Sequence, residues 1–339
     1  MIRGAILPPH ILDAIVRNGT PEQRRSALET LAASERLRGR RQARALGLLA
    51  AVPTGEKRRA VYDAGGKTRL PGRLVRSEGA PDSSDVAVNE AYEGAGTTYD
   101  LYSQVYGRNS IDGRGMEIDS SVHYGEKYDN AFWDGAQMVY GDGDGNLFER
   151  FTIAVDVIGH ELTHGVTDAE AALEYHDQSG ALNESFSDVF GSLVKQRERG
   201  QSAAEADWIV GEGLFTSRVR GVGLRSLKAP GTAYADPVLG NDPQPAHMDQ
   251  YDSSPEDDGG VHVNSGIPNH AFYLAATAIG GFAWEKAGRI WYVALTERLR
   301  PTSDFAAAAA ATQTVAGELF GAGGAEQKAV RGAWEQVGL

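Results

Sequence analysis

The sequence predicts an α+β protein with a β-rich N-terminal lobe and a helical C-terminal lobe, preceded by a short helical segment. From about residue 61 to 155, short strand-like runs alternate with turns rich in Gly, Asp and Asn, which is typical of β-structure. From about Asp156 onward, apolar residues recur at helical spacing instead. A chain of 339 residues can form two lobes with a substantial core. We therefore expect three parts, at residues 1–51, 52–175 and 176–339.

The first 51 residues carry helix signals and an unusual charge. Thr20 and Pro21 form a cap followed by proline at the first helical position, and apolar and Arg-rich positions alternate at helical spacing from Ser26 to Leu49. This stretch holds nine Arg against four Asp or Glu, a net charge of +5. The whole chain has a net charge of −13, which leaves −18 for the remainder. Opposite charges favour docking of the stretch on the acidic body, and an acidic body argues against a nucleic-acid partner.

The C-terminal lobe is predicted from helical patterns at residues 273–279, 283–299, 303–320 and 325–337. The alanine run at 306–311 favours helix and suggests no chemistry. No apolar run approaches twenty residues, so the sequence predicts no membrane span. The absence of cysteine excludes disulfides and any thiol-based latency switch.

The pattern His160-Glu161-x-x-His164 predicts a metal site. On a helix, His160 and His164 stand one turn apart on the same face, so two imidazoles can bind one ion while Glu161 points toward an open coordination position. Glu184, on a second predicted helix, would complete a catalytic zinc site with three protein ligands. Asp188 lies one helical turn after Glu184, where its carboxylate could accept the free ring N–H of a ligand histidine.

The alternative is that this pentapeptide arises by accident on an amphipathic helix. At typical residue abundances, such a pentapeptide occurs by chance in roughly one chain of this length in a hundred. Chance becomes a poor explanation once the second stretch, with Asn183, Glu184 and Asp188, follows at a workable distance.

From Val61 to Leu339 the chain resembles the thermolysin family of zinc endopeptidases. Beyond the metal motif, this resemblance rests on four segments: Asn130-Ala131-Phe132-Trp133, Leu173-Glu174-Tyr175, Leu224-Arg225-Ser226-Leu227 and Gly259-Gly260-Val261-His262. The resemblance implies a thermolysin-like two-lobe metallopeptidase fold, with the zinc helix at the floor of the cleft between the lobes.

The resemblance also implies a role for each residue. Glu161 is the general base, and a protonated His262, oriented by Asp257, stabilises the oxyanion together with Tyr175. Asn130, the Ala131 carbonyl and Arg225 hold the substrate backbone. An apolar pocket gives a preference for a hydrophobic residue just after the cleaved bond, and its expected lining residues are Phe148, Phe151, Val157, Val210 and Leu224.

Residues 1–51 have a functional interpretation as an inhibitory prosegment. Pro8-Pro9-His10-Ile11-Leu12 resembles the motif that opens the short propeptides of the protealysin subgroup, so the chain would be a latent precursor. The alternative is a basic helical cap that stays attached. Residues 46–55 are the expected junction, because their apolar residues suit the enzyme's own predicted pocket and self-cleavage there.

The remaining expectations concern cofactors, partners and compartment. One Zn²⁺ is expected, whereas the family's double calcium site is expected to be lost, because Lys195 and Ile209 replace two of its acidic residues while Asp156, Asp207 and Glu212 are kept. The resemblance implies peptide or protein substrates, a monomer and secretion. The N-terminus lacks a visible signal peptide, which leaves a cytoplasmic location as the alternative.

Three classes of function compete. The first is a zinc endopeptidase made as a latent precursor, which the complete set of ligands, base and oxyanion donors favours. The second is a zinc exopeptidase, which lacks support because no acidic amine-binding motif is evident. The third is a binding module with structural zinc, and the presence of both Glu161 and His262 argues against it.

Overall fold

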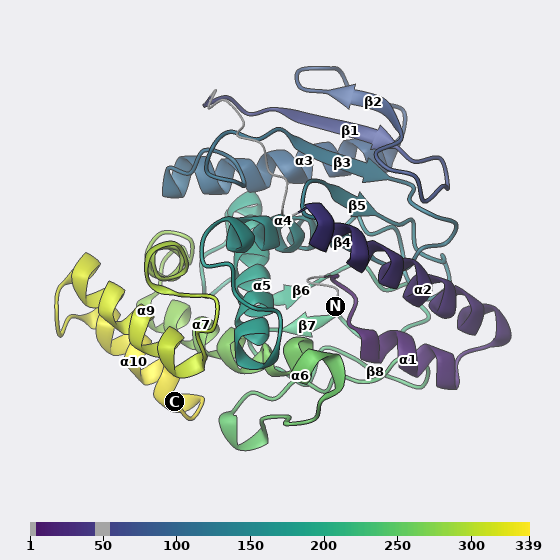
Figure 1. The fold of residues 1–339 in the computed structure, drawn as a ribbon. Coiled ribbons are helices and arrows are strands. Elements are labelled where there is room, and N and C mark those ends of the chain that lie inside the picture. Colours follow the sequence, from purple (N-terminus) through teal and green to yellow (C-terminus); the bar gives the residue numbers. More distant parts are fainter. Residues whose placement is uncertain (1–4, 45–54) are drawn as a thin grey trace.

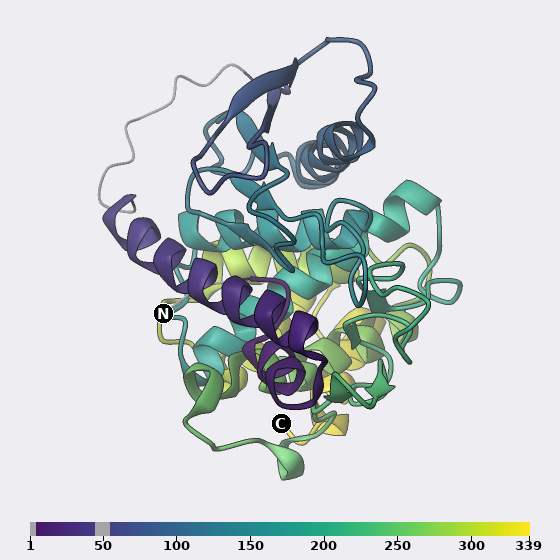
Figure 2. The ribbon, with the colours of Figure 1, turned by 90° about the vertical axis from the view of Figure 1, so that its right-hand side faces the viewer.

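The computed structural model describes residues 5–44 and 55–339, with the side chains of 35–44 excepted. Two lobes form the body, and two N-terminal helices lie across them (Figures 1 and 2). The first lobe contains a five-stranded sheet in the order β2-β1-β3-β5-β4. Its strands are β1 (Arg59–Asp63), β2 (Arg73–Ser77), β3 (Ile118–Val122), β4 (Ala131–Trp133) and β5 (Met138–Tyr140). The predicted α+β class is thus confirmed.

The sheet is mixed, and β4 is one of its edges. Parallel pairing joins β1 to β3 and β3 to β5, whereas β2 and β4 run antiparallel to their neighbours. Pairing of Ala131 with Tyr140 fixes the register of β4 against β5. The other edge of β4 receives Ala5, which forms an antiparallel bridge with Phe132. A stretch from the start of the chain therefore extends this sheet.

The prediction of strands alone between residues 61 and 155 missed a helix, α3 (Val86–Asp100), which continues as a π-helical turn at Leu101–Val105. Its glycines made the sequence resemble turns, but they serve close packing. A β-carbon on Gly94 would come within 2.3 Å of the Ile158 side chain, and one on Gly96 within 2.2 Å of the Arg59 guanidinium.

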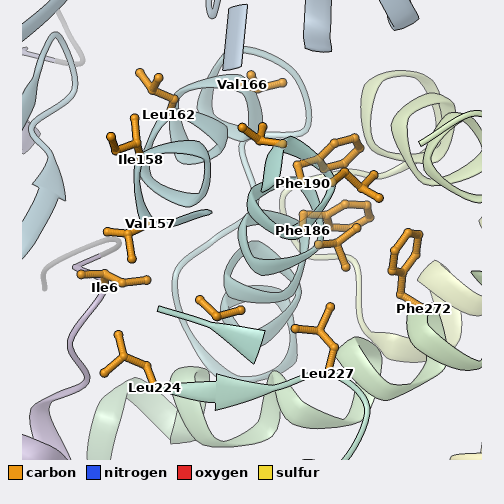
Figure 3. Close-up of a cluster of buried hydrophobic side chains, with 14 of the residues drawn as sticks. Ile6, Val157, Ile158, Leu162, Val166, Phe186, Phe190, Leu224, Leu227 and Phe272 are labelled. Carbon is orange, nitrogen blue, oxygen red and sulfur yellow. The ribbon is translucent and has the colours of Figure 1, made fainter. Parts of the chain in front are cut away.

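The centre of the molecule is a pair of buried helices, α4 (Val155–Ala169) and α5 (Asp177–Arg199). Two glycines bring their backbones together. A β-carbon on Gly159 would lie 3.1 Å from the Gly191 Cα, and one on Gly191 would lie 2.4 Å from the Asp156 carbonyl oxygen. This close approach lets side chains from the two helices meet at one point. The aromatic side of α5, with Phe186 and Phe190, packs toward the C-terminal helices (Figure 3).

The C-terminal lobe is helical, as predicted. Its helices are α6 (Glu256–Asn264), α7 (Gly266–Ile279), α8 (Ala287–Val293), α9 (Phe305–Phe320) and α10 (Ala325–Gln336), with a π-helical turn at Ala294–Arg298. The helix predicted from 273 begins earlier, at Gly266, because its Pro268 lies in the first turn, where a missing N–H is tolerated. Two pairs of two-residue strands also lie in the described part of this lobe: β6 (Ile209–Val210) with β7 (Arg225–Ser226), and β8 (Ala235–Asp236) with β9 (Gly240–Asn241).

Residues 5–44, which we call the N-terminal segment, contain α1 (Pro9–Asn18) and α2 (Pro21–Arg44). The predicted start of the second helix is confirmed by a reciprocal cap. The Thr20 amide donates to Gln23 Oε1 at 2.8 Å, and the Gln23 amide donates to Thr20 Oγ1 at 3.3 Å. Of the expected junction at 46–55, residues 46–54 lie outside the described residues. Within the described ranges, no helix is long and apolar enough to cross a membrane.

Candidate active site

Three ligand-type side chains converge where α4 and α5 meet. The Nε2 atoms of His160 and His164 are 3.0 Å apart, and they lie 3.4 and 3.5 Å from the two carboxylate oxygens of Glu184. All three side chains are buried. Ligand atoms 2.0–2.2 Å from a tetrahedral zinc lie about 3.3–3.6 Å from one another. Both histidine–carboxylate distances fall in this range and the histidine–histidine distance is slightly shorter, so the three side chains fit a zinc ion in chemistry and nearly in spacing.

The other ring nitrogen of each histidine has a fixed partner. His160 Nδ1 lies 2.8 Å from Asp188 Oδ1, and His164 Nδ1 lies 2.7 Å from Asn183 Oδ1. With both Nδ1–H groups donated to these oxygens, the Nε2 lone pairs are free to bind a metal. The structure therefore places Asp188 beside one of the two predicted ligand histidines, His160. Asn183 belongs to the second predicted stretch, but its contact with His164 was not predicted.

The electrostatics of this cluster favour a positive charge at its centre. Burial lowers the pKa of His160, but the carboxylates of Asp188 and Glu184 outweigh burial and raise it to about 9. Burial also disfavours ionisation of Glu184, yet the charges of His262 and His164 hold its pKa well below its ordinary value. The same negative potential would stabilise either a proton or a divalent cation between these groups.

Glu161 lies beside the ligands but does not join them. Its side chain is fully buried and extends from α4 to the edge strand β4, where Oε2 accepts the Trp133 amide at 2.9 Å. This contact was not predicted from the sequence, because it joins residues of two separate elements. It orients the carboxylate at the side of the metal cluster that faces the edge strand.

Two potential hydrogen-bond donors, His262 and Tyr175, lie beside Glu184. His262 Nδ1 lies 2.7 Å from Asp257 Oδ1, and the other ring nitrogen lies 3.2 Å from the Tyr175 hydroxyl. The Tyr175 hydroxyl also donates to Glu184. Burial lowers the pKa of His262, but Asp257 and Glu184 outweigh it and raise the pKa to about 9, so the ring is protonated at neutral pH.

A left-handed turn sets the distance between Asp257 and His262. Asp257, Asp258, Gly259 and Gly260 all have positive φ, between 53° and 83°. A single turn of this kind folds the Asp257 carboxylate back so that Oδ2 also accepts the His262 amide at 2.8 Å. Gly259 and Gly260 suit this turn because such φ values cost a glycine little, whereas they strain a residue with a β-carbon.

The three predicted backbone-binding groups all contact the N-terminal segment. Asn130 Oδ1 accepts the Leu7 amide at 3.0 Å, and Asn130 Nδ2 donates to the Leu7 carbonyl at 3.3 Å. The Ala131 carbonyl accepts the Ile6 amide at 3.2 Å. Arg225 Nη1 donates to the Ile6 carbonyl at 3.0 Å. One backbone–backbone bond and three bonds with the side chains of Asn130 and Arg225 therefore hold the backbone of Ile6 and Leu7 beside the edge strand.

The residues expected to line the apolar pocket lie in the same hydrophobic cluster as a side chain of the N-terminal segment. These expected lining residues are all buried: Phe148, Phe151, Val157, Val210 and Leu224. Figure 3 shows the Ile6 side chain between Val157 and Leu224. Ile6 is itself fully buried in the same cluster.

Lys195 and Ile209, which were expected to stand in place of acidic calcium ligands, also lie together. Lys195 Nζ lies 3.0 Å from Asp156 Oδ2 and 2.9 Å from Asp207 Oδ1, and it donates to the Ile209 carbonyl. Glu212, the third retained acid, pairs with Arg199 at 2.8 Å. The ammonium therefore lies among the carboxylates as an internal ion pair.

Comparison with known proteins agrees with this geometry. Residues 54–168 match the family model of the thermolysin metallopeptidase catalytic domain, and residues 171–339 match that of its alpha-helical domain. A protein named extracellular metalloprotease from Pectobacterium carotovorum is 51% identical over 336 residues, which cover 99% of this chain and 96% of the relative. Protease PrtS from a Photorhabdus strain is 47% identical, over 98% and 91% of the two chains. Among solved structures, the precursor of protealysin from Serratia proteamaculans matches with a TM-score of 0.90 and 51% identity, covering 99% of each chain.

Proposed function

This chain belongs to the thermolysin family of zinc metallopeptidases, and on that premise we propose that it is a latent endopeptidase that cleaves on the N-terminal side of hydrophobic residues. The observation that carries the proposal is the course of the N-terminal segment. Its extended residues pair with the edge strand, donate to the Ala131 carbonyl and contact Asn130 and Arg225. A peptide substrate would use the same backbone partners.

The catalytic roles follow from what each side chain can reach. Bound zinc would lower the pKa of a water molecule and polarise the scissile carbonyl. Glu161, held by the Trp133 amide, takes a proton from the attacking water and delivers it to the leaving amine. His262 and Tyr175 donate hydrogen bonds to the oxyanion, and the raised pKa of His262 keeps it in the donating form.

The pocket between Val157 and Leu224 supports the preference for a hydrophobic residue after the cleaved bond. Full burial of an Ile side chain there contributes about 1.5–3 kcal/mol relative to exposure. A charged side chain in the same place would be desolvated without a partner on the apolar walls. Selection therefore acts on the residue that follows the bond, while the backbone contacts bind any sequence.

We further propose that residues 1–51 are the intramolecular inhibitor and that residues 52–175 and 176–339 form the two lobes of the enzyme. The N-terminal segment occupies the backbone-binding groups Asn130 and Arg225 and also the apolar pocket, so a substrate cannot enter. Polar contacts hold α2 as well: Ser34 bonds the Tyr128 hydroxyl at 2.9 Å, and Ser26 donates to Asp129 at 3.0 Å. The name of the Pectobacterium relative supports secretion, and a monomer stays a prediction.

Cleavage of a quenched peptide with a central hydrophobic residue tests the function. Full-length protein should be nearly inactive. Activity should appear as about fifty N-terminal residues are removed by incubation or limited proteolysis, and a zinc chelator should abolish it. A zinc-loaded protein that stays inactive after this removal would support the binding-module alternative instead. Cleavage restricted to the terminal residue of the peptide would identify an exopeptidase.

Calcium should contribute little to stability, because we propose that Lys195 supplies the positive charge among Asp156 and Asp207. Burial opposes the charge of Lys195, but the two carboxylates outweigh burial and raise its pKa. We expect a calcium-selective chelator to change the melting temperature by no more than about 2 °C, which corresponds to about 1.4 kcal/mol in a chain of this size. A loss of 10 °C or more in differential scanning calorimetry would disprove the replacement.

Docking of the N-terminal segment should depend on pH through His10 and Asp129. His10 bonds the Tyr234 hydroxyl at 3.0 Å, and burial lowers its pKa from 6.5 to about 4. Between pH 6.5 and 4, His10 binds more protons when the segment is undocked than when it is docked. Its contribution to docking is therefore lost as pH falls through this range. Burial, and then Asp144, raises the pKa of Asp129 from 3.8 to about 8. Between pH 3.8 and 8, Asp129 binds more protons when the segment is docked than when it is undocked. Docking therefore weakens as pH rises through this range.

The two effects oppose each other between pH 4 and 6.5, and above pH 6.5 docking should weaken by at most about tenfold per pH unit up to pH 8. Hydrogen exchange of α1 amides, corrected for intrinsic rates, measures this in a full-length Glu161→Gln protein that cannot process itself. The Asp129→Asn variant should lose the alkaline slope. The His10→Gln variant should gain a slope between pH 4 and 6.5. Unchanged profiles in both variants would contradict the linkage.

A further inference from the structure

The N-terminal segment passes the catalytic centre in an orientation that holds one of its peptide bonds in place on both sides. The bond between Ala5 and Ile6 has a fixed group on each side. On its amine side, the Ile6 amide donates to the Ala131 carbonyl, and the Ile6 side chain fills the apolar pocket. On its acyl side, Ala5 bridges Phe132 of the edge strand. The bond therefore lies between two strand-like contacts that fix its direction.

The carbonyl of this bond points at the catalytic groups. The Ala5 carbonyl oxygen lies 3.3 Å from His262 Nε2, which is itself 3.2 Å from the Tyr175 hydroxyl and 3.6 Å from the ligand Glu184. One proposed oxyanion donor, His262, is thus close to a carbonyl belonging to the chain itself, and the other, Tyr175, contacts that donor. A segment that only blocked the cleft would not need to present a carbonyl to these donors.

We propose that the Ala5–Ile6 bond is a substrate of the chain's own active site, cleaved within the same molecule, and that the cleaved chain, starting at Ile6, stays latent. This inference rests on the proposed function. Water adds its oxygen to the Ala5 carbonyl carbon, and the carbon–nitrogen bond breaks. Glu161 takes one proton from the water and delivers it to the Ile6 nitrogen, and the second water proton follows to the same nitrogen, so the products are a carboxylate at Ala5 and an ammonium group at Ile6.

Cleavage leaves the inhibitory contacts in place because they lie on the Ile6 side of the bond. The contacts of Leu7 with Asn130 and of the Ile6 carbonyl with Arg225 do not involve Ala5. The new amine keeps its position beside the Ala131 carbonyl. Behind it, α1 and α2 remain covalently attached and packed, with these side chains buried: Leu7, Ile11, Leu12, Ile15 and Ala27. The tether gives the cleaved end a high effective concentration at the cleft, so it is retained as a bound product.

Processing would then occur in two separate steps. The first removes the residues before Ile6 and leaves activity low. The second severs the chain near the expected junction and allows the N-terminal segment to leave. Neither step requires the other, since the contacts of Ile6 and Leu7 persist until the helices dissociate.

The experiment follows the intact mass and N-terminal sequence of zinc-loaded, full-length protein over time. We expect a product that begins at Ile6, formed at a first-order rate that does not change when the protein is diluted tenfold. Peptide cleavage should stay low while this product accumulates. The Glu161→Gln protein should keep its original N-terminus.

The Ile6→Asp variant, which places a charge in the apolar pocket, should slow this cleavage at least tenfold. Leu28→Asp is the matched control, because it introduces the same side chain at an exposed position of α2, and it should be cleaved at the normal rate. A rate that rises with protein concentration would overturn cleavage within one molecule. An intact Ala5–Ile6 bond in a preparation whose protease-treated sample cleaves peptide would overturn the inference alone. Failure of that sample to cleave peptide would instead reject the proposed function.

Discussion

Replacing Glu161 by Gln should lower kcat for peptide hydrolysis by about 10²–10⁴-fold, the range that a positioned general base contributes. The change removes the ability to take a proton but keeps the side chain's size. It also keeps an oxygen that can accept the Trp133 amide. Because Glu161 is separate from the ligand set of His160, His164 and Glu184, zinc content should stay at one ion per chain.

Kinetics and metal analysis of the same preparation test this expectation. Wild-type and variant proteins are treated with the same added protease, so that self-processing does not limit the comparison. Glu335→Gln, the same chemical change at an exposed site on α10, is the control and should have normal activity. A Glu161→Gln protein that binds zinc and retains more than a tenth of wild-type kcat would show that another group is the base.

The two-lobe order and the metal motif were predictable because they depend on local spacing. An i,i+4 pair on one helix fixes His160 relative to His164 whatever surrounds them. Glu184 was predictable from its place in a second helical pattern. The distance between the helices was not, because it depends on Gly159 and Gly191, whose role becomes visible only when the backbones meet.

Long-range contacts account for most of what the sequence did not reveal. Asn130 and Arg225 have no meaning in isolation, and a family resemblance alone assigned them. Their contacts with Leu7 and Ile6 form only when the edge strand β4, the short strand β7 and the N-terminal segment come together in the fold. The helix α3 was missed for a related reason. Its glycines leave room for side chains of neighbouring elements and do not form turns.

Replacing Asp188 by Asn should destabilise the protein by about 3–5 kcal/mol, the range for breaking one partner of a buried ion pair. The fully buried carboxylate accepts four contacts. Arg225 Nε and Nη2 lie 2.8 and 2.7 Å away, His160 Nδ1 lies 2.8 Å away, and Asn269 Nδ2 donates at 2.9 Å. Burial opposes ionisation of Asp188, but Arg225 and His160 outweigh it and hold its pKa below the usual range. An amide would leave the buried Arg225 charge without its counterion.

The same substitution should weaken zinc binding about 10–100-fold, because Asp188 fixes the ring of His160. A double-mutant cycle with Arg225→Met separates the two effects. Removing the unpaired charge should recover much of the unfolding free energy in urea, whereas zinc affinity should stay low. Arg225→Met alone is required in the cycle, since it also loses the bond to the Ile6 carbonyl. Exposed Asp249→Asn is the matched control and should change neither quantity. If the double variant regained zinc affinity together with stability, Asp188 would act only as the counterion of Arg225, and the orientation of His160 would depend on other contacts.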